Sequence, residues 1–161
     1  MNADGLKRRT KRFALETIAL VQSLPRSQVC LIIGKQLVRA GTSVGANYRA
    51  ACRARSQADF VNKLGICEEE ADETVYWLEL LVESGNVTTD RIATLLLEAN
   101  ELTAIMSASR KTARAGLSRA ARRPAAHRGP VRAGGALRAP AAGSIGAQPQ
   151  GARGRRGLCR G

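Results

Sequence analysis

The feature that most constrains this chain is an apolar seam in its middle third, whose members are spaced alternately four and three residues apart. The seam consists of Phe60, Leu64, Cys67, Ala71, Thr74, Leu78 and Leu81. This spacing places them along one side of a single helix over residues 57–84, which would be about 42 Å long. Ser56, with Asp59 three residues later, forms a capping pair for its start, and Gly85 can end it in a left-handed conformation. A rod of this length cannot bury its own seam, so the chain must supply partner helices of similar length.

A second long stretch, residues 26–55, supplies one partner. Its apolar positions follow a single helical register: Val29, Ile33, Leu37, Ala40, Val44, Tyr48 and Ala51. The register continues through Gly41-Thr42-Ser43-Val44-Gly45, although each glycine costs about 1 kcal/mol of helix propensity relative to alanine. We predict one continuous helix with a kink at these small residues, and two separate helices are the alternative. In the continuous helix, the small residues would let a neighbouring backbone come close.

Two further amphipathic stretches complete the set. Residues 6–24 predict a first helix, and Pro25 separates it from the second, for which Ser27 is a candidate cap. Residues 89–112 predict a fourth helix. The expected apolar side of the first helix is Phe13, Ile18, Val21 and Leu24, and that of the fourth is Ile92, Leu95, Leu96, Ala99, Leu102 and Met106. Four long helices with short links indicate an all-α fold, an antiparallel up-and-down four-helix bundle formed by residues 1–113.

The remaining residues, 114–161, differ sharply in composition. The chain has a net charge of +13, but residues 1–113 account for only +2, and residues 114–161 contain 11 arginines and no acid. This Arg/Ala/Gly/Pro-rich tail has too few large apolar residues to offset its chain entropy, so we predict that it is disordered. One hypothesis is an arginine-rich arm that binds nucleic acid. The other, slightly favoured, is a shifted or read-through frame, because these four residues share GC-rich codons.

Five acids lie in one run, which suggests a carboxylate metal site at first: Glu68, Glu69, Glu70, Asp72 and Glu73. All five fall off the seam, and the chain's one histidine, His127, lies in the tail. Helical di-iron sites use inward-facing glutamates together with histidines. We therefore favour a solvated or salt-bridged face over a metal site, and expect no cofactor.

Other signs of chemistry are weak. The chain lacks a histidine for a hydrolase triad in residues 1–113, and it has no phosphate-cradling Walker loop, so we expect no enzyme activity. Cys30, Cys52 and Cys67 fall within helical patterns, where free cysteines behave as small apolar residues; Cys159 lies in the tail. No apolar run is long enough to span a bilayer or to serve as a signal core, so we expect a cytoplasmic protein with reduced thiols.

The second stretch also carries a series of cations that could form a binding surface: Lys35, Arg39, Arg49, Arg53 and Arg55. Arg49 and Arg53 are four residues apart, and hence on one helical face. One interpretation is a ridge that contacts the phosphates of nucleic acid. The other is ion pairing with the acids of the third helix, within or between subunits. The low net charge of residues 1–113 slightly favours ion pairing.

Three ordered motifs carry a family resemblance. They are Gln36-Leu37-Val38-Arg39-Ala40-Gly41-Thr42-Ser43-Val44-Gly45-Ala46-Asn47, then Ser56-x-x-Asp59-Phe60-x-x-Lys63-Leu64, and Glu70-Ala71-x-Glu73-Thr74-x-Tyr76-Trp77-Leu78-x-Leu80-Leu81 with Gly85. Over residues 7–111 the chain resembles the bacterial four-helix-bundle family that includes proteins encoded in intervening sequences of 23S ribosomal RNA genes. The residues expected to serve packing or oligomer contacts are Gly41, Ser43, Gly45, Asn47, Tyr76 and Trp77.

The resemblance implies a non-enzymatic, ring-shaped homo-oligomer, with a pentamer as the favoured subunit number. The family is similar to the accessory variability protein of diversity-generating retroelements, a basic pentameric barrel that binds nucleic acid and a reverse transcriptase. RNA or DNA, and by analogy a reverse transcriptase, are therefore candidate partners. The alternative is a protein–protein assembly or adaptor module that uses its arginines in subunit pairing.

Overall fold

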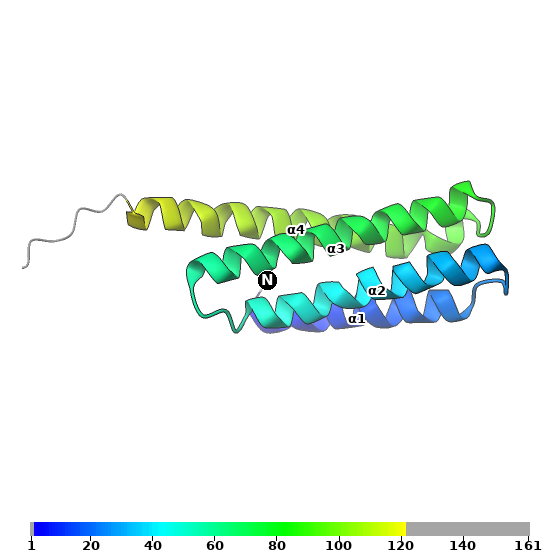
Figure 1. The fold of residues 1–161 in the computed structure, drawn as a ribbon, viewed down its shortest axis with the longest axis horizontal. Coiled ribbons are helices and arrows are strands. Elements are labelled where there is room, and N and C mark those ends of the chain that lie inside the picture. Colours follow the sequence, from blue (N-terminus) through cyan, green and yellow to red (C-terminus); the bar gives the residue numbers. More distant parts are fainter. Residues whose placement is uncertain (1, 122–161) are drawn as a thin grey trace, which may run out of the picture. The chain divides into compact units, whose positions relative to one another are not determined.

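In the computed structural model, residues 2–121 are described, and they form four α-helices without a strand. The helices are α1 (Ala3–Gln22), α2 (Gln28–Ala51), α3 (Gln57–Glu83) and α4 (Thr89–Ala121). Successive helices run in opposite directions and are joined by short links (Figure 1). The predicted all-α, antiparallel up-and-down bundle is confirmed.

The predicted caps hold the helix ends. The hydroxyl of Ser27 accepts the backbone N–H of Cys30 at 3.1 Å, and that of Ser56 accepts the N–H of Asp59 at 3.1 Å. Gly85 has a φ of +73°, the left-handed conformation expected after α3. Ser27, Ser56 and Gly85 therefore set the bounds of α2 and α3.

Helix α2 is shorter at its end than the predicted 26–55, because the chain tightens after Ala51. The N–H groups of Arg53 and Ala54 donate to carbonyls three residues back, at 3.0 Å, and the N–H of Arg55 donates to Oδ2 of Asp59 at 3.1 Å. The cap of α3 thus draws Arg55 away from α2. Arg53 and Arg55 lie in the link, not on the helix as predicted.

Helix α4 extends to Ala121, nine residues beyond the predicted end at 112, so the first part of the predicted tail is helical. Ala113 is buried, and its carbonyl accepts Nε2 of Gln57 at 3.4 Å. Leu117 is half-buried beside α3, and no proline lies between Pro25 and Pro124. These contacts continue the helix despite its basic composition. The predicted disorder of the later tail residues, with His127 and Cys159, lies outside the described residues.

The core follows the predicted seams of α2, α3 and α4, except that Phe60 and Leu96 are half-buried and the start of α2 is shifted. Every seam residue of α3 from Leu64 to Leu81 is fully buried, as are Leu102 and Met106 of α4. At the start of α2, Val29 is 47 % exposed and Cys30 is buried instead. The register there is set by the Ser27 cap, which places Cys30 and Ile33 on the inner side.

The buried side of α1 differs from the prediction. Of the four predicted residues only Phe13 is fully buried, whereas Ile18, Val21 and Leu24 are half-buried. The buried side consists of Leu6, Thr10, Phe13, Thr17 and Leu20. The two threonines can be buried because each hydroxyl donates to a carbonyl of its own helix, Thr10 to Leu6 at 3.0 Å and Thr17 to Phe13 at 2.9 Å.

These threonines face the glycines of α2, and we call this contact the glycine seam (Gly41 and Gly45 against Thr17 and Thr10). A Cβ on Gly41 would lie 2.7 Å from Oγ1 of Thr17, and a Cβ on Gly45 would lie 3.4 Å from the carbonyl oxygen of Thr10. The prediction that small residues admit a close neighbour within one continuous helix is confirmed. The predicted kink stays a prediction.

Candidate nucleic-acid interface

Arg39, one of the residues predicted to contact phosphates, is instead paired with carboxylates. Its guanidinium donates to Glu73 of α3 and lies 3.5 Å from Oε2 of Glu70. Oε1 of Glu73 also accepts the indole N–H of Trp77 at 3.0 Å. The hydrogen bonds from Arg39 and Trp77 lower the pKa of Glu73, whereas burial raises the pKa of Glu70. For Arg39, the ion-pair interpretation within one subunit is confirmed.

The acidic run of α3 is used in ion pairs with both neighbouring helices. Glu70 and Glu73 pair with α2 as described, and Oε2 of Glu68 lies 3.1 Å from Nε of Arg110 on α4. Glu69 and Asp72 are exposed. Among residues 2–121, no group of three or more potential ligands is placed to hold a metal ion. The run therefore joins helices, as the salt-bridged interpretation proposed.

The other four predicted cations are exposed but do not form one ridge. Lys35 lies 14 residues before Arg49 on α2, which corresponds to about 21 Å along the helix. Arg53 and Arg55 follow in the link beyond Ala51. The structure therefore gathers Arg49, Arg53 and Arg55 at one end of the bundle and leaves Lys35 and Arg39 apart from them.

At that end, Arg49 meets cations that sequence reasoning did not assign to the site. Lys7 and Lys11 of α1 and Arg49 of α2 line a hollow of about 200 Å³ between the two helices. Its other lining residues are small: Thr10, Ala14, Thr42, Gly45 and Ala46. We call these eight residues the α1–α2 groove. The basic start of the first helix and the antiparallel order of the bundle were the signals that could have found it.

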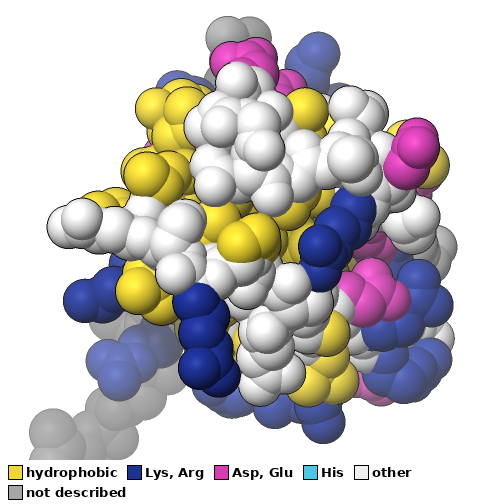
Figure 2. Space-filling view, turned by 90° about the vertical axis from the view of Figure 1, so that its right-hand side faces the viewer, with side chains coloured by type: hydrophobic (Ala, Val, Ile, Leu, Met, Phe, Trp, Pro, Cys, Tyr) yellow, Lys and Arg dark blue, Asp and Glu magenta, His cyan; other side chains and the backbone are white. Residues whose placement is uncertain are grey.

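The groove belongs to a larger basic end, where α1 and α3 begin and α2 and α4 end (Figure 1), and to which α3 contributes Asp59 and Lys63, paired at 3.4 Å. Residues 2–12, 49–55 and 110–119 contain one acid, Asp4, and these cations: Lys7, Arg8, Arg9, Lys11, Arg12, Arg49, Arg53, Arg55, Arg110, Lys111, Arg114 and Arg119. The opposite end has hydrophobic and uncharged side chains between charges of both signs (Figure 2). The charge of the bundle is therefore unevenly distributed along its length.

Four of these cations are engaged with acids between or along helices, and one of them is Lys7, which lies 3.1 Å from Asp4. Arg9 forms two hydrogen bonds with Glu98 of α4, at 2.7 and 2.8 Å, and another with Glu101. Arg12 pairs with Glu16 at 3.1 Å, and Arg110 with Glu68. Within residues 2–121, no ion pair is formed by Lys11 or Arg49.

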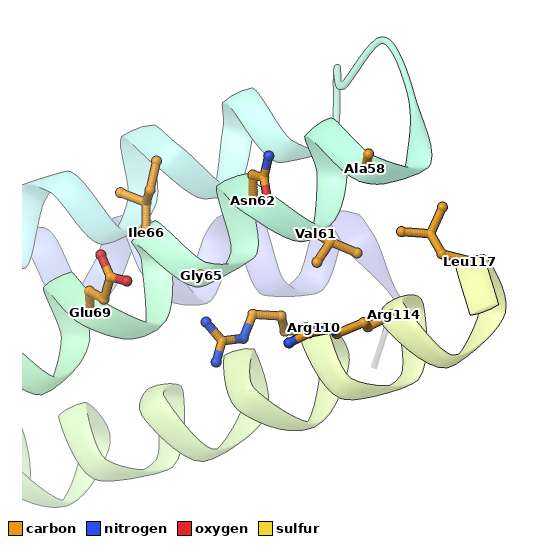
Figure 3. Close-up of a pocket in the computed structure, with 9 residues that line it drawn as sticks. All are labelled: Ala58, Val61, Asn62, Gly65, Ile66, Glu69, Arg110, Arg114 and Leu117. Carbon is orange, nitrogen blue, oxygen red and sulfur yellow. The ribbon is translucent and has the colours of Figure 1, made fainter.

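A second hollow, of about 500 Å³, lies between α3 and α4 and has a different character. Apolar side chains of Val61, Ile66 and Leu117 line it together with Arg110 and Arg114 (Figure 3). Arg110 lies across α3 at Gly65, where a Cβ would be 3.0 Å from its Nη1. The hollow is thus part apolar and part occupied by an arginine that is already paired.

The residues predicted for packing or oligomer contacts divide between inside and outside. Gly41 and Gly45 form the glycine seam, and Ser43 and Asn47 are half-buried, with the Asn47 amide donating to the Ser43 carbonyl at 3.0 Å. Trp77 is half-buried, whereas the ring of Tyr76 is 55 % exposed and meets Trp77 edge-on at 4.9 Å. The two glycines and Trp77 therefore serve packing within the subunit.

The thiols are placed as packing residues. Cys30 and Cys67 are buried, Cys52 is half-buried, and all three are free. Burial raises the pKa of Cys67 to about 12, so its thiol stays protonated at neutral pH. Across residues 2–121, the helices lack a segment with the length and apolar character needed to cross a bilayer.

Comparisons with known proteins agree with this architecture. A model of the 23S rRNA-intervening sequence protein family matches residues 6–108. A crystal structure of a protein of unknown function from the S23 ribosomal protein family of Bacteroides thetaiotaomicron is similar, with a TM-score of 0.64 and 36 % identity. The match covers 69 % of this chain and 99 % of that chain. Among curated proteins, none matches. Because the family match spans well over half of its residues, the chain belongs to the 23S rRNA-intervening sequence protein family.

Proposed function

We propose that this protein is a non-enzymatic bundle that binds RNA or DNA through its basic end. The observation that carries the proposal is the collection of twelve Lys and Arg from residues 2–12, 49–55 and 110–119 at one end, against Asp4 in those ranges and Asp59 at the start of α3. Exposed Lys and Arg side chains bind phosphates and release counterions, so affinity falls with salt. The similar Bacteroides protein is itself described as of unknown function, so the support comes from this chain's own charges.

The test must separate the bundle from the arginine-rich tail. Within residues 2–121, every buried core residue lies between Leu6 and Ala113, and the similar structure covers 69 % of the chain. A chain that ends at Ala121 therefore keeps all of these buried residues. We expect it to bind structured RNA or duplex DNA with a log–log salt slope of about −3 or steeper, as several phosphate contacts require. Salt-insensitive binding, or none, in this shorter chain would remove the bundle from the proposed function.

Assembly of several copies is a second proposal, and a different observation favours it. Leu31 and Ile32, near the start of α2, are 68 % and 57 % exposed, beside the exposed Val29. Clustered apolar side chains of this size commonly mark contacts with another protein. We expect a homo-oligomer in light scattering that Leu31→Glu with Ile32→Glu disperses, while circular dichroism stays helical. If Arg49→Glu or Arg53→Glu disperses it instead, the arginines serve subunit pairing.

A further inference from the structure

The α1–α2 groove is the part of the basic end whose cations surround a hollow. Lys7 and Lys11 stand one helical turn apart on α1, about 6 Å along its axis, and Arg49 faces them from α2. The hollow of about 200 Å³ has several times the volume that one water occupies in the liquid, about 30 Å³. A group larger than a single water can therefore enter between the three cations.

The hollow exists because of the same small residues that bring the helices together. Gly45 lies in the glycine seam, and Ala46, Ala14 and Thr42 extend too little to fill the space above it. Ala46 is exposed, and the Thr42 hydroxyl donates to the Val38 carbonyl at 2.7 Å. The oxygen of this hydroxyl is a neutral acceptor, and an ionised phosphate is the stronger partner for Lys and Arg. The groove is thus open and uncommitted.

The charges around the groove are available to a ligand. Lys11 and Arg49 form no ion pair within residues 2–121, and Lys7 pairs with the exposed Asp4 at 3.1 Å, three residues away on the same helix. An exposed pair of this kind contributes little, so Lys7 can exchange it at small cost. All three cations can therefore turn to an anionic group in the hollow.

The lining also distinguishes between kinds of partner. Protein interfaces depend on large apolar or aromatic anchors that fill pockets. The α3–α4 hollow offers Val61, Ile66 and Leu117 for such anchors, whereas the α1–α2 groove has no apolar side chain larger than alanine. A phosphodiester backbone needs charge and space rather than apolar anchors. Charge complementarity and the small lining favour a nucleic-acid strand.

We infer that the α1–α2 groove holds backbone phosphates of an RNA or DNA strand, contacted by Lys7, Lys11 and Arg49. This inference rests on the proposed function and assigns it to one place. Adjacent phosphates of one DNA strand advance about 3.4 Å along the duplex axis, so the two lysines span about two of them. The contacts carry charge and no base readout, so binding depends on salt more than on sequence.

The test fills the hollow without changing its charge. Ala46→Leu places a larger side chain in the groove, and Ala104→Leu makes the same change at an exposed position on α4 as a control. In the full-length chain and in the chain ending at Ala121, anisotropy titrations use a labelled single-stranded RNA, the DNA of the same sequence and the duplex. We expect Ala46→Leu to weaken binding at least about threefold and Ala104→Leu to leave it unchanged.

A charge-reversal pair on α2 gives an independent readout. Arg49→Glu is expected to weaken binding about tenfold or more and to reduce the salt slope by about one to two. Lys35→Glu makes a similar charge change outside the groove and is expected to have the smaller effect. Circular dichroism and light scattering check that each variant keeps its helices and assembly state, and Ala46→Leu supplies the decisive comparison if Arg49→Glu changes the assembly.

The outcomes separate the two proposals. If the parent chain ending at Ala121 binds with a steep salt slope, but Ala46→Leu matches Ala104→Leu and Arg49→Glu matches Lys35→Glu, the groove is not the phosphate site and the proposed function stands. If the chain ending at Ala121 shows no salt-dependent binding, both proposals fail. Equal losses of affinity for RNA and DNA support recognition of the shared phosphodiester backbone. A loss of affinity for only one of them identifies that nucleic acid as the ligand of the groove.

Discussion

Helix α1 meets its two neighbours by opposite means. Toward α2 it packs through the glycine seam, where Thr17 occupies the space that a side chain on Gly41 would need. Toward α4 it reaches across with the long side chain of Arg9, which pairs with Glu98 and Glu101. The contact with α2 depends on the missing side chains of the glycines. The contact with α4 depends on the charge at the end of the flexible Arg9 side chain. The two sides should therefore respond differently to added volume, to salt and to pH.

The largest effect is expected from adding volume at the glycine seam. In Gly41→Leu, the Cβ alone would lie 2.7 Å from Oγ1, 2.8 Å from Cγ2 and 3.1 Å from Cβ of Thr17, so a rotation of that side chain cannot make room. We expect a loss of about 3 kcal/mol in the free energy of unfolding, at the upper end for overpacked cores. Urea unfolding followed by circular dichroism measures it, and a loss below about 1 kcal/mol would show that the helices separate easily.

Removing the ionic contact on the other side of α1 should cost less. Arg9→Ala leaves Glu98, which is 14 % exposed at its side chain, without its partner. We expect a loss of about 1.5 kcal/mol, because the pair is largely shielded from water but not deeply buried. In 1 M salt the stabilities of the parent and Arg9→Ala should draw closer, whereas the effect of Gly41→Leu should not change. Equal salt responses in the two variants would contradict an ionic contact toward α4 and a steric contact toward α2.

A glycine four residues along the same seam should respond in the opposite direction. A Cβ on Gly45 would lie 3.4 to 3.5 Å from the nearest atoms of Thr10, which is ordinary contact. Gly45→Ala therefore gains helix propensity with little crowding, and we expect stabilisation by about 0.5 kcal/mol. Gly116→Ala is the matched control, because nothing lies within 4 Å of the added methyl group. If Gly45→Ala destabilised the protein, both Gly41 and Gly45 would be required for the close packing of α1 on α2.

The smallest effects concern the ionic contact between α2 and α3, and they depend on pH. The pKa of Glu73 is lowered by Arg39 and Trp77, so its contribution to stability is present above the ordinary glutamate pKa and is lost as pH falls through the lower folded value. The pKa of Glu70 is raised by burial, so its protonation on acidification favours the folded state. Between about pH 5 and 3, the melting temperature should fall less in Glu73→Gln and more in Glu70→Gln than in the parent. The reverse order would refute these assignments.

Much of the fold could be predicted because it depends on periodicity and caps. The α3 seam, the Ser27 and Ser56 caps and the left-handed Gly85 are local patterns, and each was confirmed. The buried side of α1 was predicted only in part, because two of its members are threonines whose hydroxyls are satisfied within the helix. The predicted end of α4 was wrong because residues 114–121 have the composition of the tail. The contacts with α3 that extend the helix are tertiary and cannot be read from the local sequence.

The candidate site was less accessible from the sequence. Arg39 and Arg49 lie ten residues apart on one helix, and the sequence predicted both as candidate phosphate contacts. In the structure Arg39 is paired with acids of α3, whereas Arg49 forms no ion pair within the described residues. Lys7 and Lys11 join Arg49 only through the antiparallel pairing of α1 and α2. The sequence shows where the cations are. Whether a given cation pairs with an acid or stays available to a ligand depends on which helices become neighbours in the fold.

The closeness at Gly41 also has a consequence for how this chain can evolve. Every residue that one base change can produce from a glycine codon carries a Cβ, and each would meet Thr17. We therefore expect substitutions of Gly41 to be tolerated only after position 17 has changed to a smaller residue. Thr17→Ala removes the atoms at 2.7 and 2.8 Å, and the Cβ that remains at 3.1 Å must shift by only a few tenths of an ångström to admit an alanine at position 41. We therefore expect positions 17 and 41, which are 24 residues apart, to vary together among homologues, with position 17 changing first.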